Sequence, residues 1–221
     1  RGVLFRSRDQ EFNMIFDTGS GALLLPGVEC EDPACENHRR FNSKNSSTAM
    51  QIGWTDEPTT ALAEGSDDRD VKAIQFAMGE AAGQYVRDVV CVGANVCAKA
   101  DFVQMTEESD NPFKDAEWDG VLGLGLAISD GPEFDVLGKW IREGKMPAQF
   151  SFYVSNAEDS EIIFGDVRKE HMAKPMVYTP ISDPGYWQFK IDDISIEGKA
   201  AGICDKAKGC QAVVEDRKSV V

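Results

Sequence analysis

Short apolar runs separated by turn residues follow one another along the chain, and helical periodicity is scarce. Runs of Val, Ile, Phe and Tyr between Gly, Pro, Asn and Asp are typical of a mainly antiparallel β protein. The pattern predicts strands at residues 12–16, 73–77, 85–92, 102–106, 150–155, 161–165, 176–180, 186–196 and 211–214.

One helix interrupts this pattern, at residues 133–145. Its apolar residues Phe134, Leu137, Trp140 and Ile141 recur at three- and four-residue spacing. That spacing places them on one face of a helix, so this segment carries convincing amphipathic periodicity.

The organisation changes at two places. Residues 56–70 are acidic and rich in turn formers, which predicts a solvated loop. A new series of strands begins near residues 147–150, so we predict a first lobe at residues 1–148 and a partial second lobe at 149–221. The second part is shorter than the roughly 100–150 residues typical of a domain.

Composition narrows the class of protein. The chain has 221 residues, 42% of them hydrophobic, which indicates a globular protein. Its formal net charge of -15 disfavours binding to nucleic acid or to anionic membranes. No run approaches the roughly 18 apolar residues of a membrane span, and the first residues lack a signal-peptide core. We therefore expect the gene product to extend beyond this chain.

Six cysteines fall into three close pairs, Cys30/Cys35, Cys91/Cys97 and Cys204/Cys210. Short loops with turn residues separate the members of each pair, which favours local disulfides and an oxidising compartment. Free or metal-bound thiols are the alternative, weakened by the absence of the C-x2-C spacing of zinc ribbons. We predict no metal site.

The compartment has a second, weaker indication. Asn45 begins an Asn-Ser-Ser triplet, which is an acceptor for N-glycosylation. We expect the protein to enter the secretory pathway and to reach the cell exterior or a lysosome- or vacuole-like compartment.

The candidate chemistry centres on Asp17 in the stretch FNMIFDTGS. Asp and Gly are turn formers, so the tetrapeptide from Asp17 to Ser20 alone is well explained as a turn. A carboxylate directly after a core strand is costly, however, unless it is hydrogen-bonded. The hydroxyls of Thr18 and Ser20 and the bare backbone of Gly19 supply suitable donors.

An ordered series of motifs along the chain favours a functional role for Asp17 over a simple turn. The chain resembles the pepsin-like aspartic proteases, peptidase family A1, in family order over nearly its whole length. The matching segments are FNMIFDTGS, CEDPAC, RFNSKNSST, IQFAMGEAAGQYVRDVVCVG, EWDGVLGLG, FSFYVS, EIIFGDV, YTPIS, YWQFKIDDISIEG and CDKAKGCQAVV. Each motif is weak alone, but the ordered series is specific.

The resemblance implies a mainly β, bilobal, barrel-like fold with a truncated second lobe. It also implies an aspartic endopeptidase, which needs two carboxylates that share a water and one proton and no cofactor. Asp17 is then the first carboxylate, Thr18 braces two loops, Gly19 carries a backbone group for the substrate, and Ser20 hydrogen-bonds Asp17.

The substrate would be an extended polypeptide, bound by a monomer as an added strand. By the same resemblance, a flap at Phe76, Ala77, Met78 and Gly79 closes over it. Phe76 stands where the family usually has a tyrosine, and Leu24 where it usually has a tryptophan. Plain hydrophobic packing and altered specificity explain the two changes equally well.

The sequence does not contain a clear second catalytic carboxylate. The family pattern places another Asp-Thr-Gly after GCQAVV, but this chain reads Glu215-Asp216-Arg217. Glu215 holds the aligned position, and Asp216 requires a slip of one residue, which reverses the face of a strand. An acid-active aspartic endopeptidase is our first hypothesis. A non-catalytic pepsin-fold protein that binds peptides is the alternative, because the dyad is incomplete.

Overall fold

The computed structural model describes residues 4–7, 10–76, 78–93, 95–126, 131–156, 159–204 and 209–214, with the backbone alone for residues 4–7. Strands dominate these residues, as the sequence predicted, and helices are few and short. Among the described residues, no helix is long and apolar enough to cross a membrane.

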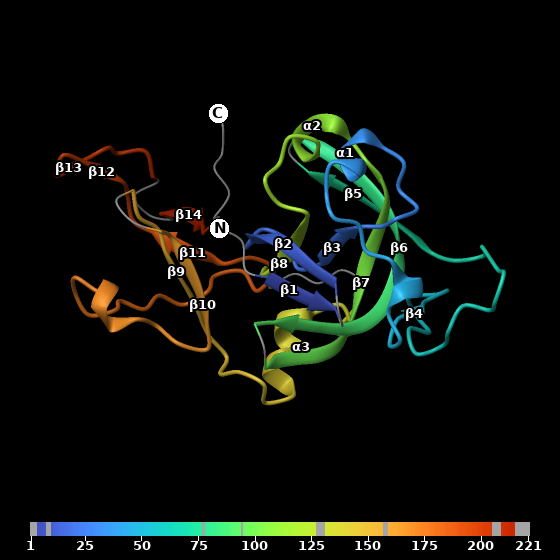
Figure 1. Ribbon diagram of the computed structural model, residues 1–221. Coiled ribbons are helices and arrows are strands. Elements are labelled where there is room, and N and C mark those ends of the chain that lie inside the picture. Colours follow the sequence, from blue (N-terminus) through green and yellow to red (C-terminus); the bar gives the residue numbers. More distant parts are fainter. Residues whose placement is uncertain are drawn as a thin grey trace.

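The first eight strands form one mixed sheet (Figure 1). They are β1 (Leu4–Ser7), β2 (Gln10–Asp17), β3 (Leu23–Pro26), β4 (Met50–Gln51), β5 (Val71–Phe76), β6 (Gly79–Val92), β7 (Val96–Glu108) and β8 (Gly120–Gly123). Their order is β1-β2-β8-β3-β7-β6-β4, and β5 pairs with β6 outside this path. The pairs β2–β8 and β3–β7 are parallel, whereas the remaining pairs are antiparallel.

The sheet closes on itself, because β1 pairs with both β2 and β6. The ring β1-β2-β8-β3-β7-β6 therefore has no free edge among its members, which is how barrels avoid exposing unpaired backbone groups. Strands β4 and β5 are additions to β6. The barrel-like form that the family resemblance implies is present in this part of the chain.

Two apolar cores lie against the two faces of this sheet. Strand β3 shows why, since Leu23 and Leu25 belong to one core, called the first core here, and Leu24 to the other, the second core. Alternate residues of a strand point to opposite faces, so a strand buried on both sides reads as a continuous apolar run. Strand β3, although it is such a run, was not predicted from the sequence, and neither were β1, β4 and β8.

The predicted helix exists but is shorter than expected. Helix α3 (Val136–Arg142) begins after Asp135, whose carboxylate accepts a hydrogen bond from the Gly138 amide at 2.6 Å. Trp140 is fully buried and donates its indole N–H to the Val90 carbonyl at 3.1 Å. Phe134 precedes the helix and packs on Tyr85 in the other core, so it does not belong to the helical stripe.

The other helical segments are single turns. They are α1 (Pro33–Glu36), α2 (Asp110–Phe113) and the 3-10 helices η1 (Ser43–Asn45) and η2 (Lys169–His171). The predicted loop at residues 56–70 is mostly exposed and contains no helix or strand. Its one regular feature is an isolated β-bridge between Ala61 and Ile52.

The strands from Phe150 onward form three separate pairs. They are β9 (Phe150–Tyr153) with β10 (Glu161–Phe164), β11 (Gln188–Ile191) with β14 (Cys210–Val213), and β12 (Ser195–Ile196) with β13 (Lys199–Ala200). In Figure 1 they extend to the left of the eight-stranded sheet. The change in architecture coincides with the predicted change in pattern near residues 147–150.

Two strand predictions in this part are wrong. Residues 176–180 form no strand, and the side chains of Val177 and Tyr178 are 93% and 87% exposed. Pro175 and Pro180 bracket this stretch and cannot donate to a ladder. Residues 186–196 divide into β11 and β12, because the Asp193 carboxylate accepts hydrogen bonds from the amides of Gly202 and Ile203.

The three predicted disulfides, Cys30–Cys35, Cys91–Cys97 and Cys204–Cys210, are formed. The second joins residues that face each other across the β6–β7 hairpin. Six cysteines are thereby accounted for, and the disulfide reading of the pairs is confirmed.

Candidate active site

Asp17 is the last residue of strand β2 and lies at a buried position of the sheet. Its apolar residues Phe12 and Met14 are buried in the first core, and Asp17 is itself only 6% exposed. The parallel neighbour β8 pairs Asp17 with Gly123. The carboxylate thus sits where two parallel strands end side by side.

Both oxygens of the Asp17 carboxylate are hydrogen-bonded within the following turn. The Gly19 amide donates to Oδ1 at 2.9 Å, and the Ser20 hydroxyl donates to Oδ2 at 2.6 Å. Hydrogen bonds to the charged form offset the cost of burying a carboxylate. The geometry therefore matches the local support that the sequence assigned to Gly19 and Ser20.

The segment that follows β8 is hydrogen-bonded to the turn that contains Asp17. The amides of Leu124 and Gly125 donate to the carbonyls of Asp17 and Ser20, each at 2.7 Å. A side chain at Gly123 would collide with the backbone of Gly21 and Ala22 at 2.5 Å. Glycine is thus required at this crossing, because the two backbones touch there.

A buried aspartate supports the start of the same arrangement. Asp119, just before β8, accepts hydrogen bonds from the Asn13 amide at 2.7 Å and the Arg39 amide at 3.0 Å. It also lies 4.0 Å from His38 Nδ1. These contacts connect the middle of β2, the start of β8 and the segment after α1.

Thr18 connects this loop to a distant part of the chain. Its hydroxyl donates to the carbonyl of Val214 at 3.0 Å, although 196 positions separate the two residues. Val214 immediately follows β14, whose last pair with β11 is Val213 with Gln188. The Asp17 loop and the end of β14 are therefore neighbours, as the bracing role expected for Thr18 requires.

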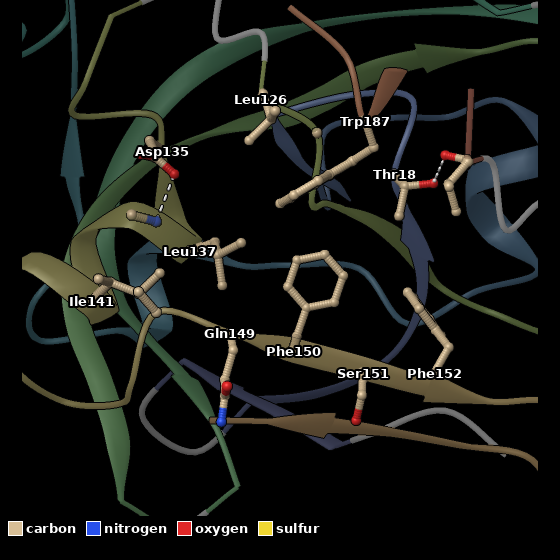
Figure 2. A pocket seen from close by; sticks show the side chains of 14 residues that line it. Thr18, Leu126, Asp135, Leu137, Ile141, Gln149, Phe150, Ser151, Phe152 and Trp187 are labelled. Atoms are coloured by element: carbon tan, nitrogen blue, oxygen red, sulfur yellow. Dashed lines mark hydrogen bonds between the residues drawn. The ribbon is translucent and has the colours of Figure 1, made fainter. Parts of the chain in front are cut away.

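A cavity of about 680 Å³ lies beside Thr18 (Figure 2). Its lining is largely apolar, with Phe150 and Phe152 of β9 pointing toward Trp187 and Thr18, and Leu137 and Ile141 of α3 opposite. Asp17 is not among the lining residues. The cavity lies between the first sheet and the later strands, and it is not centred on the carboxylate.

Trp187 borders this cavity and was not singled out from the sequence. Its indole N–H donates to the Leu124 carbonyl at 2.7 Å, and its ring meets Phe150 edge to face at 5.4 Å between centroids. Leu124 is the residue whose amide supports Asp17. The position follows from chain folding over more than sixty residues, so no local pattern could have identified it.

The predicted flap is the β5–β6 hairpin. Phe76 pairs with Gly79 at its end, and the Gln75 amide group donates to the Gly79 carbonyl at 3.0 Å. Met78 at the tip is 43% exposed. Ala77 lies outside the described residues.

The two altered positions near the flap contribute to the same apolar core. Leu24 is 1% exposed within it, and Phe76 packs against it with its ring edge to face with Phe113 at 5.4 Å. Phe113 in turn meets Trp118 at 5.8 Å. Hydrophobic packing explains both residues in this structure, and their effect on specificity stays a prediction.

The remaining predicted positions divide into two groups. Asn45 is exposed at the end of η1, as an acceptor for a glycan must be. Glu215 and Asp216, the candidates for the second carboxylate, lie outside the described residues. Among the residues that are described, no group of three or more His, Cys, Asp or Glu side chains is placed to hold a metal ion.

Comparison with known proteins agrees with this geometry. A family described as eukaryotic aspartyl protease matches residues 5–219. The chain is 37% identical over 217 residues to procardosin-B of Cynara cardunculus, covering 95% of this chain and 39% of that protein. It is 35% identical over 219 residues to oryzasin-1 of Oryza sativa subsp. japonica and to phytepsin of Hordeum vulgare, covering 96% of this chain and 40% of each.

The chain thus spans less than half of the length of these relatives. The match nevertheless includes nearly every residue of this chain, and it includes the strands and the turn that carry Asp17. The chain belongs to the eukaryotic aspartyl protease family.

Proposed function

We propose that Asp17 is the first of two catalytic carboxylates in an aspartic endopeptidase that hydrolyses peptide bonds at acidic pH. The observation that carries this proposal is the support of the Asp17 carboxylate, one oxygen by the Gly19 amide and the other by the Ser20 hydroxyl. The Gly19 contact alone is common in Asx turns, but a turn does not require a carboxylate that is buried where two parallel strands end.

The chemistry requires a partner acid. Two carboxyls at close range retain one proton between them, because both cannot ionise together. The ionised member removes a proton from water as it attacks the scissile carbonyl, and the protonated member polarises that carbonyl. Thr18 is a positioning residue in this scheme, since it bonds to Val214, which precedes Glu215 and Asp216 in sequence.

We further propose that the two parts of the chain are a first lobe at residues 1–148 and part of a second lobe at 149–221. A single closed sheet before Phe150 and separate strand pairs after it support that division. The protein would act as a monomer on extended polypeptides under the β5–β6 flap. Three disulfides favour a secreted or vacuolar site of action.

The test is cleavage of acid-denatured globin at about pH 3.5, an acidity at which a carboxyl dyad retains its shared proton. We expect activity to be blocked by a statine-type inhibitor. Asp17→Asn should lower kcat by at least about 10³-fold, as expected for a group that acts directly on the reacting water. Asp56→Asn, in the exposed 56–70 loop, is the matched control and should leave kcat unchanged. Cleavage that survives Asp17→Asn would sink the proposal.

The partner acid is identified by two further variants. Glu215→Gln and Asp216→Asn remove one candidate each, and only the true partner should abolish cleavage. If one of these two residues is the partner acid, exactly one variant abolishes cleavage. If cleavage survives both substitutions, neither residue is the partner acid.

A second function is favoured by one observation, namely that Glu215-Asp216-Arg217 stands where the family has Asp-Thr-Gly. In that case the protein binds peptides without cleaving them. It would then show no turnover of globin, while calorimetry would still detect binding of the statine peptide.

A further inference from the structure

Glu108, the last residue of β7, is a buried acid that the proposed chemistry does not use. It is only 6% exposed, and its buried Oε2 atom has no hydrogen-bond partner among the described residues. An unpaired polar atom in the interior is costly, and more so when the group is charged. A carboxyl in this position therefore favours its neutral form.

The position of Glu108 is the base of the flap. Glu108 pairs with Ala81 of β6, which pairs with Ile74 of β5, so the three residues form one row across the three strands. Ala81 is buried and Ile74 packs beside it in the second core. The hairpin that carries Phe76 and Met78 thus rests on this row.

The next residue fastens the flap to β7 and α2. The Ser109 amide donates to the Glu80 carbonyl, and the Glu80 amide donates to the Ser109 hydroxyl, both at 3.0 Å. The Ser109 hydroxyl also donates to the Asn111 carbonyl at 2.8 Å. A side chain at Gly79 would collide with Asn111 and Ser109. Any outward movement at Glu108 therefore acts on the attachment of the hairpin.

A second carboxylate faces Glu108. Asp32 lies just before α1, inside the Cys30–Cys35 disulfide loop, and its Oδ2 accepts a hydrogen bond from the Glu108 amide at 2.9 Å. Burial, and then repulsion from Asp32, raise the pKa of Glu108 to about 7. Both residues line a cavity of about 480 Å³ together with flap residues on either side of the hairpin turn.

The other charged groups on the elements around Glu108 are mixed in sign. They are Glu31 and Glu36 beside and in α1, Lys72 on β5, Glu80 on β6, Glu107 on β7, Asp110 in α2 and Lys114 after it. Lys114 is paired with Asp110 at 3.1 Å. Glu107 is exposed, in contrast to Glu108, and it lines the same cavity. Asp32 is the charged group that acts on Glu108.

We propose that Glu108 is a protonation-controlled anchor of the flap: the neutral carboxyl stays buried in the row of residues at the base of the β5–β6 hairpin, whereas the ionised carboxylate favours a solvated position and loosens the hairpin. The function of the flap over a substrate rests on the proposed function, but the anchor itself does not. It would confine the closed flap to the acidic range in which a carboxyl dyad works.

The sign of the effect follows from proton linkage. The closed state binds the Glu108 proton with a pKa of about 7, whereas an open, solvated flap base has the ordinary value of 4.5. Closure is therefore fully favoured below pH 4.5 and weakens as the pH rises to 7. Above pH 7 the loss is complete, and it corresponds to opening that is on the order of 100-fold more frequent than at pH 4.

Hydrogen exchange measured by mass spectrometry tests this directly. We expect opening of residues 71–83 in the wild-type protein, corrected for intrinsic exchange rates, to rise on the order of 100-fold between pH 4 and pH 7.5. Glu108→Gln should flatten this dependence to within about threefold. Glu107→Gln, at the exposed neighbouring residue, is the matched control and should keep the wild-type profile.

A second variant guards against misfolding of Glu108→Gln. Asp32→Asn keeps an oxygen that can accept the Glu108 amide, and it removes the facing charge. It should move the midpoint of flap opening to lower pH, since less repulsion lowers the pKa of Glu108. Direct ¹³C titration of the Glu108 carboxyl in the wild-type protein provides an independent readout, with an expected midpoint near 7.

Three results would overturn the anchor. They are a Glu108 carboxyl that titrates near 4.5, a Glu108→Gln variant whose flap keeps the wild-type pH profile, and a Glu107→Gln variant that flattens the profile equally. None of these measurements needs peptide cleavage, so failure of the anchor is distinguishable from failure of the proposed protease activity.

Discussion

The strands before Phe150 and those after it differ in how completely they are paired and covered. Strands β1 to β8 share one sheet that closes on itself and separates two apolar cores. Strands β9 to β14 form three isolated pairs, and apolar side chains such as Val154 and Ile196 are 80% and 67% exposed there. Stability in this chain is therefore concentrated in the first part.

The two parts of the chain also differ in how deeply their ion pairs are buried. The first part buries an ion pair between Arg87 and Asp101, whose side chain is fully inaccessible. The later part has an ion pair between Arg168 and Glu161 in which both side chains are partly exposed. Buried pairs are strongly destabilising to break, whereas exposed pairs contribute little. This contrast makes the comparison testable with single substitutions.

The largest effect is expected from emptying the first core. Phe102 is fully buried and meets Phe41 edge to face at 5.2 Å, so Phe102→Ala should lower the free energy of unfolding by about 3–5 kcal/mol. Tyr178→Ala, in the exposed stretch, should change it by less than about 0.5 kcal/mol. Urea denaturation followed by tryptophan fluorescence measures both, and equal losses would contradict the comparison.

The second effect concerns the buried ion pair. The Arg87 guanidinium donates to both oxygens of Asp101, at 2.5 and 2.9 Å. Burial raises the pKa of Asp101 despite this partner, while the hydrogen bond to Asp101 raises the pKa of Arg87. We take the pair as ionised, because the two-point geometry is that of a guanidinium with a carboxylate.

Breaking that pair leaves the Arg87 guanidinium with only its longer contact to Glu133, at 3.5 Å, among the ion pairs of the described residues. Asp101→Asn should therefore cost about 3 kcal/mol of unfolding free energy, and Glu161→Gln in the later part less than about 1 kcal/mol. The same urea titrations, run at pH 7, give both values. A smaller loss for Asp101→Asn than for Glu161→Gln would show that burial does not separate the two parts.

The sequence predicted elements that have a clear local pattern. The strands around residues 12–16 and 85–92 were predicted because they are runs rich in Val, Ile, Phe and Tyr between turn residues, and the helix near Trp140 because its apolar residues recur at three- and four-residue spacing. Strand β3, a run of four residues that ends in Pro26, was not predicted. Residues 176–180 were assigned to a strand by composition alone, and pairing with a neighbour, which composition does not encode, is what makes a strand.

The candidate site divides in the same way. Asp17, Gly19 and Ser20 are adjacent in sequence, so their contacts are local and could be read from the motif. The contact of Thr18 with Val214 was expected only through the family resemblance, since it spans 196 positions. The burial of Glu108 could not be read from the pair Glu107-Glu108, because only the twist and register of β7 decide which of the two points inward.

The third effect tests the contact between the two parts. Thr18→Val removes the hydroxyl that donates to Val214 and should cost about 1 kcal/mol, the usual net value of one hydrogen bond. Hydrogen exchange of residues 210–214 should quicken about fivefold. Thr106→Val is the matched control, because its hydroxyl donates to Ala82 within the first sheet. Equal effects of the two variants at residues 210–214 would remove Thr18 as the connection.

The smallest effect is expected from carboxylates whose pKa the fold lowers. In the first part, the hydrogen bond from Lys139 lowers the pKa of Glu133, and in the later part the Gly202 amide does so for Asp193. A carboxyl group whose pKa is lowered in the folded state stabilises the fold at pH values above the ordinary carboxyl pKa. This stabilisation is lost as the pH falls through the lowered pKa.

Solvent screening keeps the contribution of Glu133 to the free energy of unfolding small, because its side chain is 39% exposed. Glu133→Gln should thus lower the free energy of unfolding by less than about 0.5 kcal/mol at pH 7, and the difference should vanish near pH 2. Asp193→Asn should leave the urea midpoint unchanged and quicken exchange only at the amides of residues 194 and 202–204, which are hydrogen-bonded to its carboxylate. A shift of the global midpoint by Asp193→Asn would mean that the later strand pairs unfold together with the first sheet, and the two parts would then have to be treated as one cooperative unit.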